Sequence, residues 1–137
     1  MTALGGALRL WNLGHPHHLV FDETYYVKEA GSYLRFGYEM APRQDLTTTG
    51  GADGAWNHGT TDIFGTAPEF VVHPPGGKWM IAAGEWALGA DNPWGWRISA
   101  AVAGTLAILL MARIGRRLLG STLLGATAAL LLAVDGQ

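Results

Sequence analysis

The chain has 137 residues, of which 49% are hydrophobic and only 15% charged, and its formal net charge is −2. These proportions exclude an intrinsically disordered chain and disfavour an ordinary soluble domain, in which about 25% of residues are charged, so they favour a membrane protein. The balance of 9 basic and 11 acidic residues excludes a nucleic-acid footprint, and the absence of cysteine excludes disulfide scaffolds and thiol catalysis.

The first predicted element covers residues 1–14, an apolar stretch with no charged n-region and no clear cleavage signal, which argues against a signal peptide. It is too short to span a bilayer. We interpret it as the end of an earlier transmembrane helix, with Arg9 and Trp11 near the outer interface, where aromatic rings prefer to lie. The chain therefore has the pattern of a piece that starts inside a spanning helix.

Residues 15–96 form the predicted extracytoplasmic loop. Between residues 22 and 96 there are ten acidic and four basic residues, an acidic and polar composition. Apolar residues at helical spacing predict two helices, at about 22–37 and 78–89, and the second aligns Trp79, Ala82, Ala83 and Trp86 as an interfacial helix. The Gly-, Thr- and Asp-rich residues 39–67 show no periodicity and predict a long loop.

Two uncharged runs in the last third predict transmembrane helices over residues 97–113 and 119–134. The arginines of the predicted turn over 114–118 and its edge, Arg113, Arg116 and Arg117, mark the cytoplasmic side by the positive-inside rule. Residues 135–137 then begin another extracytoplasmic segment. A buried helical hairpin of a soluble protein is the alternative, but so short a chain has no large core. We expect a mainly α, polytopic membrane protein.

Asp22 and Glu23 are the first candidate site residues, because they follow the first apolar stretch closely, where carboxylates are costly unless used or paired. A carboxylate at a helix N-terminus keeps a low pKa and can accept a hydroxyl proton. Alternatively, Asp22 caps the helix and Glu23 interacts with its dipole.

The second candidate is the run from His73 to Lys78, in which two prolines and two glycines precede a helix. Such a turn aims His73 and exposes backbone N–H groups to an anion, with Lys78 adding charge. The alternative is a purely structural role, in which the turn is a rigid start of the following helix and His73 fills space and makes a hydrogen bond.

Arg97 directly precedes an apolar run and so lies at the level of lipid phosphates, which an arginine binds bidentately. A snorkelling flank residue is the alternative. No metal site is predicted. His15, His17 and His18 surround Pro16 in a turn, and two prolines directly after His73 disfavour a helical pairing with Glu69.

A family resemblance rests on an ordered series of motifs: FDE with YY, HPP-x-GK, WR and LLxxDG. Together they resemble the N-terminal part of the actinobacterial-type protein O-mannosyltransferases, which use dolichyl- or polyprenyl-phosphate-mannose. The resemblance covers the chain from Leu8 onward and implies a multispanning GT-C glycosyltransferase of the plasma membrane, with residues 15–96 extracytoplasmic. Family members are several hundred residues long, so most of the donor cavity would lie outside this chain.

The resemblance also implies roles for individual residues. Asp22 and Glu23 match the catalytic acid pair, and Arg97 matches an arginine associated with the donor lipid phosphate. His73, Lys78 and Tyr25 match motif positions that would support the substrate site. The implied reaction is an inverting transfer in which Asp22 accepts the proton of the acceptor hydroxyl, Glu23 orients it, and Arg97 neutralises the departing phosphate.

The implied partners are a polyprenyl-phosphate-mannose donor, an exported protein or peptide with an acceptor Ser or Thr, and the lipid bilayer. The motifs require no redox cofactor and imply no divalent metal. We expect the chain to be inactive alone. Two other functions remain open: a non-enzymatic membrane anchor or assembly subunit, and another lipid-phosphate-sugar GT-C transferase, such as an arabinose or aminoarabinose transferase.

Overall fold

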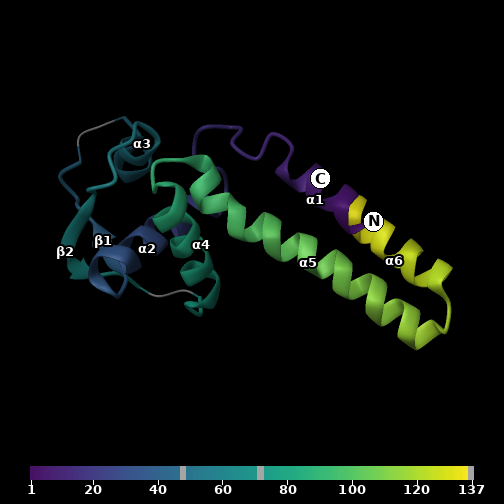
Figure 1. Ribbon diagram of the computed structural model, residues 1–137. Coiled ribbons are helices and arrows are strands. Elements are labelled where there is room, and N and C mark those ends of the chain that lie inside the picture. The colour runs from purple at the N-terminus through teal and green to yellow at the C-terminus, as the bar shows by residue number, and fades with distance from the viewer. Residues whose placement is uncertain (47–48, 71–72, 136–137) are drawn as a thin grey trace. The chain divides into compact units, whose positions relative to one another are not determined.

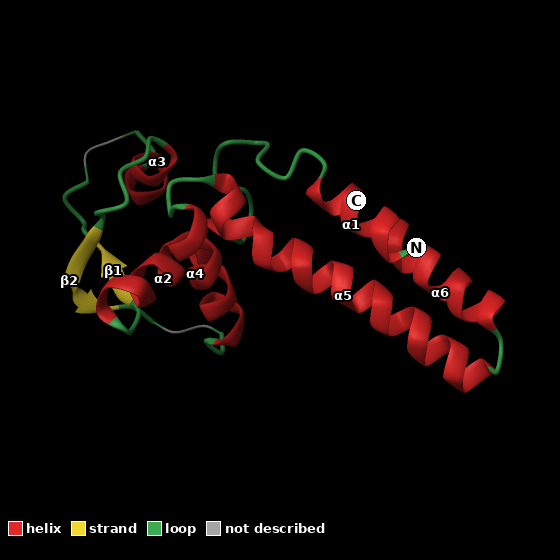
Figure 2. Cartoon of the chain, in the orientation of Figure 1, coloured by secondary structure: helices red, strands yellow, loops and turns green. Residues whose placement is uncertain are grey.

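The computed structural model describes residues 1–46, 49–70 and 73–135, and in this part of the chain six helices and one two-stranded sheet form (Figures 1 and 2). The chain divides into two compact units, one of residues 14–99 and one that combines residues 1–13 with residues 100–137. Helices dominate both units, which confirms the prediction of a mainly α fold.

In the unit of residues 14–99, α2 (Glu23–Phe36) packs against α4 (Gly76–Leu88). Helix α2 ends at Gly37, whose φ of +79° is a left-handed conformation that glycine adopts without steric cost. Helix α4 begins two residues before the predicted start at residue 78, because Pro75, with φ of −73°, already has the backbone geometry of a helix start.

The predicted long loop over 39–67 is wrong in part, because three short elements lie within or across it. These are β1 (Met40–Pro42), α3 (Gly51–Asn57) and β2 (Phe64–Pro68). The strands pair antiparallel, with Met40 opposite Pro68 and an irregular register between Met40 and Pro42. Trp56 and Phe64 enter the core of this unit, so the segment is packed. Elements of three to seven residues are too short to produce a periodic hydrophobic pattern.

Helix α5 (Pro93–Leu119) begins before the predicted span over 97–113. The side-chain oxygen of Asn92 accepts a hydrogen bond of 3.0 Å from the backbone N–H of Trp94, and proline occupies the first helical position. The hydropathy pattern locates the start of the uncharged run, whereas the N-cap determines the first residue of the helix. Here the helix starts four residues before the predicted span.

The predicted turn over 114–118 is also wrong, because α5 continues through it to Leu119. Arginine and leucine are good helix formers, and the first residue in this stretch that breaks the helix is Gly120, with φ of +61°. The arginines at positions 113, 116 and 117 therefore lie in the last turns of α5. The next helix, α6 (Thr122–Val134), starts three residues after the predicted 119, where the Ser121 hydroxyl accepts from the N–H of Leu124 at 3.3 Å.

Small residues bring the helices of the second unit together. A Cβ atom at Gly5 of α1 (Thr2–Leu10) would lie 2.2 Å from the Ile108 side chain, and one at Gly125 would lie 2.7 Å from the carbonyl oxygen of Ala112. Arg9 donates hydrogen bonds to the carbonyl oxygens of Leu132 (3.1 Å) and Ala133 (3.3 Å), the last turn of α6. Such close packing of glycine and alanine faces is typical of helices in membranes.

Within the described residues, α5 is the one helix whose length and apolar composition suffice to cross a membrane. Helix α6 is apolar but has only 13 residues. The first of the two predicted spans therefore has the required length, and the second stays a prediction.

Candidate active site

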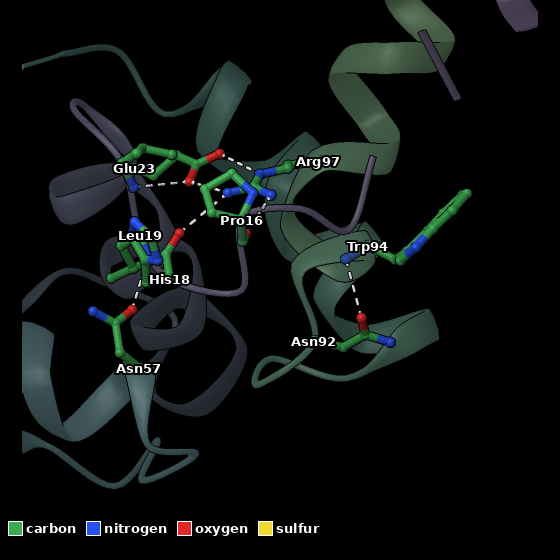
Figure 3. A network of polar contacts seen from close by, with 9 residues as sticks. Pro16, His18, Leu19, Glu23, Asn57, Asn92, Trp94 and Arg97 are labelled. Carbon is green, nitrogen blue, oxygen red and sulfur yellow. Dashed lines mark hydrogen bonds and ion pairs between the residues drawn. The ribbon is translucent and has the colours of Figure 1, made fainter. Parts of the chain in front are cut away.

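The candidate site is built around a fork-shaped ion pair between Arg97 and Glu23 (Figure 3). The Nε of Arg97 donates to Glu23 Oε1 at 2.7 Å, and its Nη2 donates to Oε2 at 2.8 Å. Two parallel hydrogen bonds fix the carboxylate in the guanidinium plane. The side chains are 11% and 24% exposed, so water still reaches the pair.

The same arginine holds the segment that precedes α2. Its Nη1 donates to the carbonyl oxygen of Pro16 at 2.8 Å, and its Nη2 to that of His18 at 3.2 Å (Figure 3). The N–H of Val20 donates to Glu23 Oε2 at 3.1 Å. Arg97, on the first turns of α5, thus ties the turn before α2 to the first residue of α2.

Asp22 differs from Glu23 because its carboxylate is exposed and makes no hydrogen bond or ion pair within the described part of the chain. Asp22 stands at the N-cap position of α2, but its backbone is in the helical region and its side chain accepts no capping hydrogen bond. The alternative of a helix cap therefore has no support in the geometry. Of the predicted acid pair, Glu23 is paired and Asp22 has an open carboxylate.

The residue before Asp22 has an unusual backbone. Phe21 has φ of +50°, a conformation uncommon outside glycine, and its side chain is 88% exposed. Flanking hydrogen bonds keep this turn in place, including one of 2.7 Å from the Thr24 hydroxyl to the Phe21 carbonyl oxygen. Residues in such sparsely populated conformations cluster at functional sites.

Tyr25 and His73 both lie at the surface of this unit, as support of a substrate site requires. The ring of His73 packs edge-to-face on Tyr26, with 5.6 Å between the ring centroids. Because Tyr26 follows Asp22 by four residues, the two share one face of α2, and His73 lies near that face. The structure thereby brings the His73 turn to the first turns of α2. The roles of Tyr25 and His73 in binding stay predictions.

Lys78 does not lie at the surface, where the turn before it predicts an added charge. Its side chain is buried, only 2% exposed, with Nζ at 2.9 Å from Glu29 and 2.5 Å from Glu39. Burial lowers the pKa of Lys78, but its hydrogen bonds to Glu39 and Glu29 outweigh burial and raise that pKa above its usual value. Lys78 is therefore a charged internal group that already has two carboxylate partners, and it adds no open charge to the turn.

Three buried acids, two packed beside α4 and one on it, are not among the site residues predicted from the sequence. Glu29, Glu39 and Glu85 are all buried, and the Tyr33 hydroxyl donates to Glu39 at 3.0 Å. Both oxygens of Glu85 lack a hydrogen-bond partner in the described part of the chain, and burial raises its pKa to about 9. Glu85 is therefore a neutral carboxylic acid at pH 7. The one available signal was the seven-residue spacing of Lys78 and Glu85, which puts them on one face of α4.

The described residues contain no group of three or more His, Asp or Glu side chains arranged to hold a metal ion. What the site offers is an open carboxylate, Asp22, beside a carboxylate that an arginine fixes. An exposed carboxylate of this kind can accept a proton from a hydroxyl group.

Known proteins with similar sequences share this whole segment. The family model described as dolichyl-phosphate-mannose-protein mannosyltransferase matches residues 1–137. The polyprenol-phosphate-mannose–protein mannosyltransferase of Mycolicibacterium smegmatis (strain ATCC 700084 / mc(2)155) is 39% identical over 139 residues, covering 99% of this chain and 22% of that protein. The proteins of the same name from Mycobacterium tuberculosis (strain ATCC 25618 / H37Rv) and Corynebacterium glutamicum are 36% and 38% identical, over 99% and 85% of this chain and 22% and 19% of their own lengths. No solved structure matches.

The chain thus spans about a fifth of the length of the curated relatives it matches, 22% for the mycobacterial proteins. The family match nevertheless runs from its first residue to its last. It confirms the resemblance drawn from the FDE, HPP-x-GK and WR motifs. This chain belongs to the dolichyl-phosphate-mannose-protein mannosyltransferase family, a family of membrane proteins that carry out protein O-mannosylation.

Proposed function

We propose that this chain supplies the acid pair and adjoining extracytoplasmic segment of an enzyme that moves mannose from a polyprenyl phosphate to Ser or Thr of exported proteins. Family membership supports the reaction class. The open carboxylate of Asp22 beside the fixed pair of Glu23 and Arg97 is the observation that carries the proposal. Because the relatives are far longer, we expect the chain alone to transfer no mannose.

The proposed reaction is an inverting displacement at the anomeric carbon of mannose. The acceptor hydroxyl oxygen forms the new bond to that carbon, while the bond from the carbon to the phosphate oxygen breaks and its electron pair leaves with the lipid phosphate. Asp22 takes the hydroxyl proton. Glu23, fixed by Arg97, holds the start of α2 and so keeps Asp22 in position.

Arg97 is the proposed ligand of the donor phosphate. A phosphate would replace the contacts of Arg97 to the carbonyl oxygens of Pro16 and His18. The other edge of the guanidinium group is already occupied by the Glu23 carboxylate, which accepts two hydrogen bonds from it. Tyr25 and His73 are the proposed contacts to substrate on the surface around Asp22. We reassign Lys78 to the interior, where it holds α4 to its neighbours.

The proposed topology has α5 and α6 crossing the plasma membrane, with the arginines at the end of α5 in the cytoplasm and residues 15–96 outside. Single cysteines at Asp62 and Leu118, both at the surface, provide a test because the chain contains no native cysteine. A membrane-impermeant maleimide added to intact cells should label position 62 and not position 118. Equal labelling of the two positions would contradict this topology.

The catalytic proposal needs a full-length enzyme. We would replace the matching segment of the Mycolicibacterium smegmatis relative with residues 1–137 and measure mannose transfer from polyprenyl-phosphate-mannose to a Thr-containing peptide in membranes. In this chimera Asp22→Asn should lower the rate by about 10²–10⁴-fold, the usual cost of losing a positioned general base, with donor binding little changed.

The matched control is Asp45→Asn, which removes another exposed carboxylate of the same unit and should leave transfer unchanged. Asparagine caps a helix as well as aspartate does, so a cap would survive the substitution. Full activity of the Asp22→Asn chimera would remove Asp22 from the mechanism. If the chimera without substitutions were inactive at the expression level of the relative, residues 1–137 could not replace the matching segment of that enzyme, and the proposal would be contradicted.

A further inference from the structure

Helix α5 ends in three arginines that no carboxylate neutralises. Arg116 and Arg117 follow Arg113 by three and four residues, so the three side chains lie on one face of the helix. All three are exposed, and none makes an ion pair or a side-chain hydrogen bond within the described part of the chain. The single acid among residues 1–13 and 100–137 is Asp135, which follows the other end of α6. A helix of that length puts roughly 20 Å between its two ends.

The fold itself does not balance this charge. Arginines three and four residues apart on a helix repel one another. The negative end of the dipole of α5 attracts cations in its last turn, but this dipole is equivalent to only about half an elementary charge. Three guanidinium groups therefore leave the end of α5 strongly positive, and an anion bound there would remove the repulsion.

The arginines line a cavity at this end of the helix pair. The cavity has a volume of about 640 Å³ and lies between the end of α5, the start of α6 and the start of α1. Helices α5 and α6 are joined here by residues 120–121 (Figure 2). Their backbones are in close contact, because a Cβ atom at Gly115 would lie 3.1 Å from the Cα of Gly125. The arginines thus stand on two packed helices.

The polar wall of the cavity suits a phosphate group. A guanidinium group donates two parallel hydrogen bonds to phosphate oxygens, and three such groups face the same cavity. Thr122, the first residue of α6, lines it as well, so the positive end of a second helix dipole adds to the charge of the arginines. Both features favour a bound anion with several oxygen atoms.

The other wall of the cavity is apolar, which indicates a ligand with a hydrocarbon part. Leu110 and Ile114 line the cavity and are 56% and 51% exposed. Leu106, one turn earlier on the same face of α5, is 53% exposed and extends this apolar strip away from the arginines. Because α5 has the length and composition to cross a membrane, its end lies at the level of lipid headgroups.

We propose that the end of α5 and the start of α6 bind an anionic phospholipid. Arg113, Arg116 and Arg117 hold the phosphate of its headgroup, and its acyl chains lie along Leu106 and Leu110. Basic cavities between membrane helices are suited to such headgroups. Assignment of the lipid to the cytoplasmic leaflet rests on the topology proposed above, whereas the binding itself does not. The bound lipid would neutralise the arginines and hold the two helix ends together.

Native mass spectrometry of the purified chain in a non-ionic detergent provides the test. The probe is dioleoylphosphatidylglycerol, and the reference is the phosphatidylcholine with the same acyl chains, which also contains a phosphate but has no net charge. We expect one bound phosphatidylglycerol with an affinity at least about ten-fold higher than that of phosphatidylcholine. Single Arg→Gln changes at positions 113, 116 and 117 should each weaken this binding about five-fold. The matched control is Arg43→Gln, which removes an exposed cation of the other unit and should leave binding unchanged.

Two further variants distinguish a cavity from a diffuse attraction between charges. Arg116→Lys keeps the charge but loses the planar fork, and Ala126→Leu keeps every charge but narrows the cavity that Ala126 lines. Both should weaken the binding of phosphatidylglycerol several-fold, and circular dichroism would establish that each variant retains its helices.

Three results would overturn the proposal. Unchanged binding in both Arg116→Lys and Ala126→Leu would show attraction to the positive charge alone. Equal binding of phosphatidylglycerol and phosphatidylcholine would show a site that does not select an anion. Displacement of phosphatidylglycerol by an equal concentration of glycerol phosphate, which has no acyl chain, would show a site for a soluble phosphate.

Discussion

Two groups of ion pairs in the unit of residues 14–99 differ in how far water reaches them. The Arg97 cluster, Arg97 and Glu23, has side chains 11% and 24% exposed. The Lys78 cluster, Lys78 with Glu29 and Glu39, has side chains between 0% and 4% exposed. Breaking an ion pair that water reaches costs little free energy, so such a pair can exchange partners. Removing one member of a buried ion pair costs several kcal/mol of stability, because the remaining charge is left buried without a partner. The first cluster is therefore suited to meeting a ligand and the second to holding elements together.

Removing the cation of the Lys78 cluster should have the largest effect on stability. Lys78→Met keeps the length of the side chain but leaves Glu29 and Glu39 buried without a positive partner, which should cost about 3–5 kcal/mol. Thermal unfolding of the chain in detergent micelles, followed by tryptophan fluorescence, measures this loss. The control is Arg43→Met, which breaks the exposed pair with Asp45 and should change nothing measurable. Equal unfolding temperatures for the two variants would contradict the comparison.

Glu85, on the same helix as Lys78, should make the stability of the folded chain depend on pH. Its pKa is about 9 in the folded chain against an ordinary value of 4.5 for glutamate, so between these values the unfolded chain loses a proton that the folded chain keeps. Stability should therefore fall as pH rises from about 5 to about 9, by at most about 1.4 kcal/mol per pH unit for one proton. Glu85→Gln, which cannot ionise, should flatten this slope in urea titrations at several pH values. A parallel slope in both proteins would argue against a neutral Glu85.

The smallest effect is expected in the Arg97 cluster. Arg97→Lys keeps the charge but loses the fork, and because water reaches the site the stability change should be about 1 kcal/mol. In the chimera the same variant should raise the KM for polyprenyl-phosphate-mannose several-fold and lower kcat. A change in unfolding temperature with unaltered donor kinetics would make Arg97 a purely structural residue.

Sequence patterns located the residues of the Arg97 cluster but not their pairing. Asp22, Glu23 and Arg97 stand out because charged residues beside apolar runs are costly unless used. The pairing of Glu23 with Arg97 joins positions 74 residues apart, which local patterns do not encode. Whether the carboxylate of Asp22 caps α2 depends on backbone angles at one residue, and residue type alone is consistent with either outcome.

The burial of Lys78 was not predictable from the sequence for a different reason. The turn before Lys78 suggested an exposed cation, but the face of α4 that turns inward is fixed by its packing on α2. Aligned tryptophans normally mark the buried side of a helix or its lipid-facing side, and only the packing distinguishes the two. Glu39, which lies 39 residues before Lys78, had no local motif that would connect it to the helix.

The left-handed backbone of Phe21 has a consequence for how Asp22 is presented. A phenylalanine at φ of +50° costs about 1–3 kcal/mol relative to an ordinary conformation, so the residues of this turn do not prefer the shape that they adopt. The shape is imposed by the hydrogen bonds of Val20 and Thr24 on either side. The orientation of the carboxylate is thus a property of the folded surroundings, and a short peptide with the same FDE sequence would spend most of its time in other conformations.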